Sequence, residues 1–359
     1  MSDALAGGVF ATSGGDGSSD EHSELRALVD DIGRRSFEAR IGQRKLPEAF
    51  DSEAWSTLED TGLSRLTTTE DLGAGPTEAA IVLRGLARHA VAAPVAETDL
   101  LAAWLAQTAG VPVPESGPLT LAVVDADGAA RGVPWTRACA AVVLAARTDD
   151  GLRVAVARPD ELDITDGHNL AGEPRDLVRA AIPADAVPCG AAVADELTRR
   201  GAWARCVQIM GVLDAAAEMT VAHTRERVQF GRALSRFQAV QHSLAGMAGE
   251  IERARAASTL AVTAAADHGF ASAQADYAVT LAKITLGRVV PAVSTTAHQL
   301  HGAIGVTMEH QLWSATNRAH SWITEFGSTG HYARRLGRRA FDAAGGSDGT
   351  LWDALTWAQ

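Results

Sequence analysis

At 359 residues, the chain is long enough to form two or three compact units. Its hydrophobic content of 47% and its charged content of 21% are typical of a soluble globular protein. The formal net charge of -12 argues against binding to nucleic acid or to an anionic membrane, because phosphate-rich surfaces repel an acidic protein.

The cysteine content argues against a disulfide framework or a zinc site. Cys139, Cys189 and Cys206 are odd in number and lack the spacing of metal ligands, which fits a reducing compartment. No apolar run approaches the ~18–20 residues that a membrane helix needs. The N-terminus also lacks a basic segment followed by an apolar stretch, as a secretion signal would require. We therefore expect a cytoplasmic protein without a membrane span.

The first third of the sequence predicts a tail followed by a helical domain. Residues 1–20 are rich in Gly, Ser and Asp and predict a disordered tail. Residues 21–110 predict helices, in which Asp51 caps a short helix and Gly62 ends it. A longer helical stretch, broken at Pro94, follows in this segment. Apolar residues of the first helix recur at intervals of three and four residues: Leu25, Leu28, Val29 and Ile32.

The pattern changes at residue 111, where Pro and Gly precede short β-type runs. Turn signals such as Asp127-Gly128 and Asp150-Gly151 separate these runs. Residues 111–190 therefore predict a small antiparallel β domain. The predicted strands cover residues 119–124, 141–146, 154–157 and 177–182.

Residues 191–359 are rich in alanine and predict a helix bundle. The helical pattern is interrupted mainly at Gly231, Gly269, Pro291 and Gly302. One apolar stripe at helical spacing indicates core packing, and its members are Phe237, Val240, Leu244, Met247 and Ile251. The predicted fold class is thus α+β and mostly α, with a helical, a β and a second helical domain in that order.

Three motifs occur in order in the C-terminal half. Residues 227–232 read R-V-Q-F-G-R and are followed by F-Q-A-V-Q at 237–241. Residues 299–305 read Q-L-H-G-A-I-G, and residues 326–329 read F-G-S-T. These motifs resemble R-x-Q-F-G, Q-x-x-G-G-x-G and Y-E-G-T of the acyl-CoA dehydrogenase family, with Ala303 in place of the family's second glycine.

The resemblance covers residues 51–339 and implies the fold and cofactor of that family. The expected fold is an N-terminal helical domain, a middle antiparallel β domain and a C-terminal four-helix bundle. The expected cofactor is FAD, and the expected substrate is an acyl-CoA thioester. Arg227 matches the arginine that pairs with the FAD pyrophosphate, a contact suited to the guanidinium fork. Matching the family's cofactor contacts are Arg227, Gln229, Phe230, Gln238, Gln299, Gly302, Ala303 and Thr329.

The catalytic carboxylate of the family is missing from both positions where its members keep one. In that family a glutamate removes the α-proton of the thioester while the β-hydride goes to the flavin. The resemblance puts this glutamate at Gly327 or, in some members, at Gly201. Neither glycine has a side chain that accepts a proton.

Glu325 is the candidate for a displaced base, two residues before the family position. In a helix, two residues correspond to roughly 200° of rotation, which would turn Glu325 to the opposite face. In a loop the carboxylate can still reach the substrate. The competing interpretation is a glutamate that balances nearby arginines.

The middle domain departs from the family as well. Residues 113–117 replace the family's L-T-E-P-x-x-G-S-D segment, whose backbone and hydroxyl groups hold the flavin ring. Only Trp135-Thr136 resembles the W-x-T flavin contact that follows later in the family's middle domain, and the spacing of the two residues is altered here. The groups that serve a subunit's own site are thus largely lost.

Three functional hypotheses follow from this combination. In the family, groups such as Arg227 and Gln299 reach across an interface to the cofactor of a neighbouring subunit. The first hypothesis is a subunit that completes a paralogous partner's FAD site in an α2β2 assembly, similar to heteromeric enzymes of steroid side-chain breakdown. Retention of Thr329, a residue of the subunit's own site, fits this less well. The second is a self-sufficient, homo-oligomeric dehydrogenase that uses Glu325 or another displaced base. The third is a flavin-free scaffold, or an enzyme of other chemistry, on the same fold.

Overall fold

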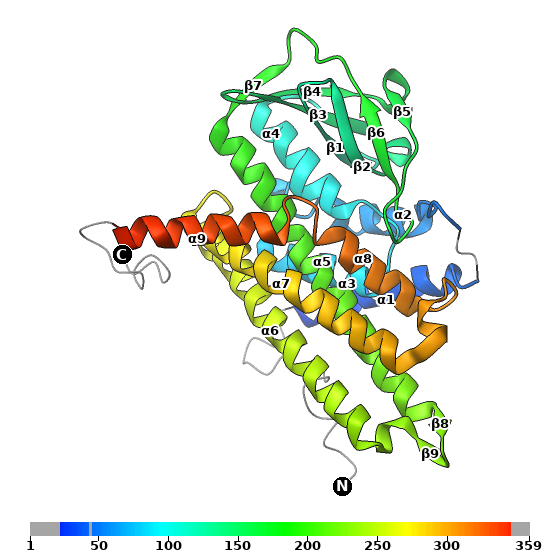
Figure 1. The fold of residues 1–359 in the computed structure, drawn as a ribbon. Helices are drawn as coiled ribbons and strands as arrows, with labels where there is room; N and C mark the ends of the chain where they lie inside the picture. The colour runs from blue at the N-terminus through cyan, green and yellow to red at the C-terminus, as the bar shows by residue number, and fades with distance from the viewer. Residues whose placement is uncertain (1–21, 43–44, 346–359) are drawn as a thin grey trace.

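The computed structural model describes residues 22–42 and 45–345, so the expected tail at 1–20 lies outside the described residues. Helices come first, strands second and long helices last, as the sequence predicts. Figure 1 shows the strands at one end of the molecule and the β8–β9 hairpin at the opposite end. No helix in the described ranges is long and apolar enough to cross a membrane.

The N-terminal helices begin and end largely where local signals place them. The Asp51 side chain accepts a hydrogen bond from the Ala54 N–H at 3.0 Å, and Gly62 has a φ of 74° just after the helix end. The helical pattern is interrupted around Pro94 and resumes as a π-helix at η3 (Glu97–Ala103). The helices of this region are α1 (Ser23–Ala39), α2 (Ser52–Asp60), α3 (Pro76–Arg88) and α4 (Trp104–Ala109).

The strands form two small sheets, ordered β1-β3-β4-β7 and β2-β6-β5. The expectation of a wholly antiparallel domain was wrong in one pairing, because β1 and β3 run parallel. Between them the chain crosses to the second sheet as β2 and returns, so it re-enters the first sheet in its original direction. The strands are β1 (Leu119–Val124), β2 (Ala129–Pro134), β3 (Ala141–Thr148), β4 (Gly151–Ala157), β5 (Asp163–Thr165), β6 (Arg175–Arg179) and β7 (Val187–Gly190).

The C-terminal half forms the predicted bundle. Pro291 lies inside α7 and does not interrupt it, contrary to the sequence prediction. A proline removes one backbone hydrogen bond, and the fully buried Val289, Val290 and Val293 hold the helix in the core around it. The elements are α5 (Ala191–Glu226), β8 (Val228–Gln229), β9 (Arg232–Ala233), α6 (Gln238–His268), α7 (Ala273–His301), α8 (Gln311–Trp322) and α9 (Thr329–Gly345).

Helix α5 links the N-terminal helices to the bundle. It packs on α3 so closely that a Cβ on Gly211 would overlap the carbonyl oxygen of Arg84. Ion pairs flank this crossing, with Arg84 Nη2 at 2.6 Å from Asp214 and Arg88 Nη2 at 2.8 Å from Glu218. The glycine thus permits the close approach on which the interface between the two helical regions depends.

A stack of histidine rings joins α5, α7 and α8 at the end of the bundle away from the sheets. The ring of His301 lies 4.5 Å from that of His223 and 4.9 Å from that of His310, measured between centroids. Its Nδ1 lies 2.8 Å from the Ala297 carbonyl oxygen, and its Nε2 is buried without a partner among the described residues. Burial, together with the neighbouring imidazoles of His223, His310 and His298, lowers the pKa of His301 to about 4.

This histidine stack should make the fold less stable in acid. An unfolded His301 takes up a proton near its ordinary pKa, whereas the folded one stays neutral down to about pH 4. The free energy of unfolding should therefore fall between pH 6.5 and 4, by about 3 kcal/mol at most for this group. Chemical denaturation across this range checks the expectation. His301→Gln should flatten the profile, whereas the exposed His242→Gln should leave it unchanged.

Candidate functional site

Seven of the predicted cofactor residues lie together at the end of the bundle that carries the β8–β9 hairpin. Helices α6 and α7 run antiparallel, so the start of α6 lies beside the end of α7, and the His223–His301 stack brings the end of α5 to the same place. We call this surface the outer end. Its residues are exposed: Arg227, Gln229, Phe230, Gln238, Gln299, Gly302 and Ala303.

The outer end offers groups that fit the phosphate part of a dinucleotide. Arg227 is exposed and forms no ion pair within the described chain, so its guanidinium fork is available. Gly302 has a φ of 67°, and no atom lies within 4 Å of where its Cβ would be, which leaves the backbone accessible to a ligand. Phe230 is 89% exposed at the hairpin tip, where Gly231 also has a positive φ.

Thr329, the remaining predicted cofactor residue, does not lie at the outer end. It begins α9 and packs against Gly287 in the middle of α7, where a Cβ would overlap its side chain. Fifteen residues of α7 separate Gly287 from Gly302, which corresponds to roughly 22 Å along the helix. The structure therefore does not bring Thr329 together with the outer end.

The two positions of the family's base are enclosed by aromatic rings. A Cβ on Gly201 would overlap the ring of Phe326. Gly327 has a φ of 109°, and a Cβ there would lie 2.8 Å from the Tyr332 ring. A larger residue at either position would have to displace a ring, and at Gly327 it would also adopt a strained backbone.

Glu325 lies in the turn between α8 and α9, clamped by two arginines. Its carboxylate accepts hydrogen bonds from Arg175 Nε at 2.9 Å and from Arg205 Nε at 2.6 Å. Burial opposes ionisation, but the two guanidinium groups outweigh it and lower the pKa of Glu325 to about 2. A carboxylate with this pKa is a weak proton acceptor at neutral pH.

Lys283 holds the same turn from the other side. Its fully buried ammonium group donates to the carbonyl oxygens of Ile323 at 2.7 Å and Glu325 at 2.8 Å. Burial lowers the pKa of Lys283 to about 8. The turn that carries both Glu325 and Gly327 is thus fixed from two directions.

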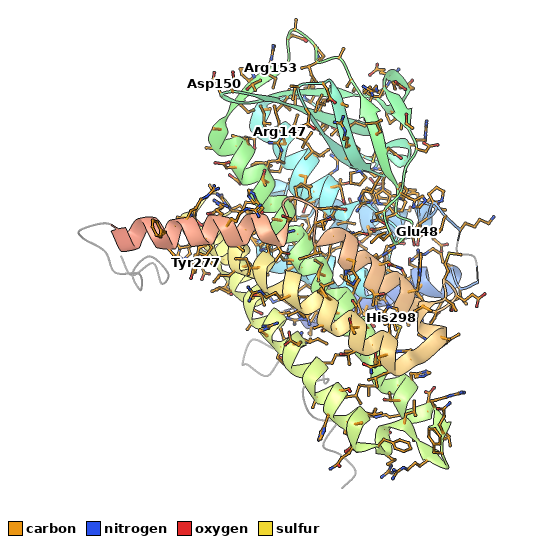
Figure 2. The ribbon with its side chains drawn as sticks, in the orientation of Figure 1. Glu48, Arg147, Asp150, Arg153, Tyr277 and His298 are labelled. Carbon is orange, nitrogen blue, oxygen red and sulfur yellow. The ribbon has the colours of Figure 1, made fainter. Side chains whose placement is uncertain are left out.

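The clamp belongs to a longer line of alternating acidic and basic groups, which we call the buried charge chain. Beyond the clamp, Arg205 pairs with Glu97 at 2.5 Å, and Arg318 pairs with Glu48 at 2.6 Å. Figure 2 labels Glu48 where the sheets meet the helices. In order, the members are Glu97, Arg205, Glu325, Arg175, Glu173, Arg318, Glu48 and Arg40.

Most members of the buried charge chain were not predicted from the sequence. One signal was available, because Arg205 stands in the apolar run Trp203 to Val207 of a helix. A charged residue in such a run is almost never buried unless it is paired. The identity of its partners, 108 and 120 residues away, has no local signature.

A small pocket between α3, α5, α8 and the sheets is lined in part by four members of the buried charge chain, namely Glu97, Glu173, Arg175 and Arg205. Only about 20 Å³ remains there, room for roughly one water molecule. Trp135 and Thr136 are 4% and 0% exposed, and Trp135 packs on Phe50. These are the two residues that resemble the family's W-x-T flavin contact. This pocket is too small for an isoalloxazine ring or an acyl chain, whereas the outer end offers groups of the kind that bind the polar part of FAD.

Comparisons with known proteins agree with the motifs. A family model described as the acyl-CoA dehydrogenase C-terminal domain matches residues 189–341. The acyl-CoA dehydrogenase IpdE2 of Mycolicibacterium smegmatis is 26% identical over 341 residues, which is 89% of this chain and 100% of that protein. Acyl-CoA dehydrogenase FadE27 of Mycobacterium tuberculosis is 28% identical, over 82% of this chain and 89% of its own length.

Solved structures show the same fold. The ChsE4-ChsE5 complex from Mycobacterium tuberculosis matches with a TM-score of 0.78 and 23% identity, over 93% of this chain and 99% of that one. A variant of the Tcur3481-Tcur3483 steroid acyl-CoA dehydrogenase also has a TM-score of 0.78, with 25% identity over 91% of this chain and 99% of that one. The motifs, the fold and the relatives agree: the chain is similar to acyl-CoA dehydrogenases, and its residues 189–341 match the C-terminal domain of that family.

Proposed function

We propose that this chain is a subunit of an FAD-dependent acyl-CoA dehydrogenase and completes the active site of a paralogous partner in an α2β2 assembly. The observation that carries the proposal is the buried charge chain, which pairs Glu325 with two arginines beside the family's base position and lines a pocket of only about 20 Å³. Glycine at both base positions supports it, and so does the exposure of the outer end.

In this proposal the outer end serves the partner's cofactor. Arg227 would pair with the pyrophosphate oxygens of FAD, while the amides of Gln229, Gln238 and Gln299 would contact its polar groups. Bound FAD would supply the acceptor for the hydride that leaves the β-carbon. The base that takes the α-proton would be a carboxylate of the partner subunit, because this chain has glycine where the family keeps one.

The substrate class is proposed from a relative. The Tcur3481-Tcur3483 protein is described as a steroid acyl-CoA dehydrogenase and carries two components. We extend both features to this chain, so the expected substrate is the CoA thioester of a steroid-derived acid. The assembly would form the α,β double bond of that thioester.

The chain purified alone should bind little FAD and show no acyl-CoA dehydrogenation. Co-expression with a paralogous acyl-CoA dehydrogenase subunit should restore flavin absorbance and turnover, and Arg227→Gln in this chain should release flavin from that complex. Absorbance spectra and single-turnover assays of both preparations check this. Robust oxidation of acyl-CoA by the pure homomer would overturn the proposal, and a complex that stays colourless would favour a flavin-free scaffold.

Glu325→Gln should act on stability and not on chemistry. Neutralising this carboxylate leaves Arg175 and Arg205 buried without a full counter-charge, which should cost about 3–5 kcal/mol of unfolding free energy. Denaturant unfolding and turnover of the assembled enzyme are the measurements, with the exposed Glu38→Gln as the matched control. Loss of turnover at unchanged stability and flavin absorbance would instead assign Glu325 as the base.

Restoring the family's carboxylate should not create an active homomer. Gly327→Glu must adopt a φ of 109° against the Tyr332 ring, so it should lose about 1–3 kcal/mol of stability and gain no turnover. Gly330→Glu, three residues on at the start of α9 and without a positive φ, should keep the wild-type stability. Substantial turnover by the Gly327→Glu homomer would show that the interior admits an acyl chain.

A further inference from the structure

The hydrogen bonds of His301 hold its imidazole ring in the neutral form. Its Nδ1 lies 2.8 Å from the Ala297 carbonyl oxygen, so this nitrogen carries the ring's hydrogen and donates it. The other nitrogen, Nε2, therefore has no hydrogen in the neutral ring, and it is buried without a partner in the described chain. A proton on Nε2 would bury a charged N–H group that has no acceptor, which is costly.

Two neighbouring rings, those of His298 and His310, are held in a similar way. Thr316 donates its hydroxyl hydrogen to the Leu312 carbonyl oxygen at 2.9 Å, so its oxygen accepts from His298 Nε2 at 2.9 Å. His298 Nδ1 then has no hydrogen, and it too is buried without a partner among the residues that the structure describes. Figure 2 labels His298 near the end of α7. His310 Nδ1 accepts the Leu312 N–H at 3.1 Å and caps α8, which a proton on that nitrogen would prevent.

The groups around these rings do not favour a positive charge. Those that titrate or carry charge come from α5, from α7, and from α8 with the segment before it: His223, Glu226, Arg227, His298, His301, His310 and His320. Glu226 is the acid among them, and at His223 its effect is smaller than that of Arg227. Burial lowers the pKa of His223 and of His298 as well as that of His301. The histidine stack is therefore built to stay neutral.

The segment between α7 and α8 has few other contacts that hold it in place. Its first part is η7 (Gly302–Val306), in which Ile304 and Val306 are 44% and 61% exposed and only Gly305 is buried. Gly305 lies against His301, since a Cβ on it would be 2.8 Å from the His301 Cβ. A segment that buries so few apolar side chains opens at a lower free energy than the core does. Its attachment thus depends on the neutral rings.

We propose that the histidine stack is an acid-sensitive latch, which releases the segment between α7 and α8 while the rest of the chain stays folded. In the closed form the rings are neutral and stacked. In the open form water solvates them, and each ring takes up a proton near its ordinary pKa of about 6.5. Opening is therefore favoured as the pH falls below about 6.5 and suppressed above it.

The effect of the latch on a cofactor rests on the proposed function. Gln299 precedes the segment, and Gly302 and Ala303 belong to it, so opening would remove three of the contacts proposed for the partner's FAD. The co-expressed complex should retain flavin through gel filtration at pH 7.5 and lose it at pH 5. Retention at pH 5 with the segment open would contradict this link.

The test of the latch is hydrogen–deuterium exchange of the chain alone at pH 7.5 and pH 5, expressed as protection relative to the intrinsic exchange rate at each pH. Protection of residues 302–310 should be at least about tenfold lower at pH 5, because opening takes up one proton or more. The middle of α7 should keep its protection, since Val289, Val290 and Val293 are fully buried there.

His301→Gln replaces the ring by a group that does not titrate, so residues 302–310 should lose the pH dependence of their protection. The exposed His242→Gln should retain it. If His301→Gln does not fold, the half-buried His223→Gln serves as the second variant and should weaken the pH dependence.

Equal protection of residues 302–310 at both pH values in wild type would overturn the inference. The same pH dependence in His301→Gln and His242→Gln would do so too, and so would a parallel loss of protection in the middle of α7, which indicates unfolding of the whole chain. Because the exchange experiment uses the chain alone, a complex without flavin would contradict the proposed subunit role and not the latch.

Discussion

The pairing of Glu325 with Arg175 and Arg205 is the constraint on which the centre of this molecule depends. Moving such charges out of water costs several kcal/mol per ion, and pairing offsets that cost only when each charge meets another in good geometry. Acid and base alternate from Glu97 to Arg40, between the end of α1, η3, α5, α8 and the second sheet. Arg318 meets the requirement least well, because its Nε lies 3.8 Å from Glu173 and its Nε and Nη1 have no hydrogen-bond partner among the described residues. Removing Arg205 would leave Glu97 buried without an ion-pair partner among the described residues.

The buried charge chain is also the feature on which the proposed subunit role rests. An acyl chain needs a dry apolar cavity, and a base needs freedom to accept a proton at neutral pH. Here the interior holds room for roughly one water, and Glu325 is committed to two guanidinium groups. Polar groups suited to a cofactor remain on the surface at the far end of the bundle.

Positive charge is concentrated in two regions of the surface. The chain is acidic overall, yet arginines gather along α9 around Asp276, and Arg227 stands free at the hairpin. Local excess charge of this kind selects anionic ligands even when the net charge repels extended polyanions.

Local patterns in the sequence determined the order of the helical and β regions, most helix ends and the resemblance to a family. Asp51 and Gly62 act through their immediate neighbours, and the Arg227 and Gln299 motifs are contiguous, so no tertiary information was needed to recognise them. The role of Glu325 was open because it depends on whether α8 ends before it and on arginines 120 and 150 residues away. The parallel β1–β3 pairing and the ring over Gly201 were likewise decided by the tertiary structure. Contacts between distant segments determine them, and such contacts leave no periodicity or spacing in the sequence.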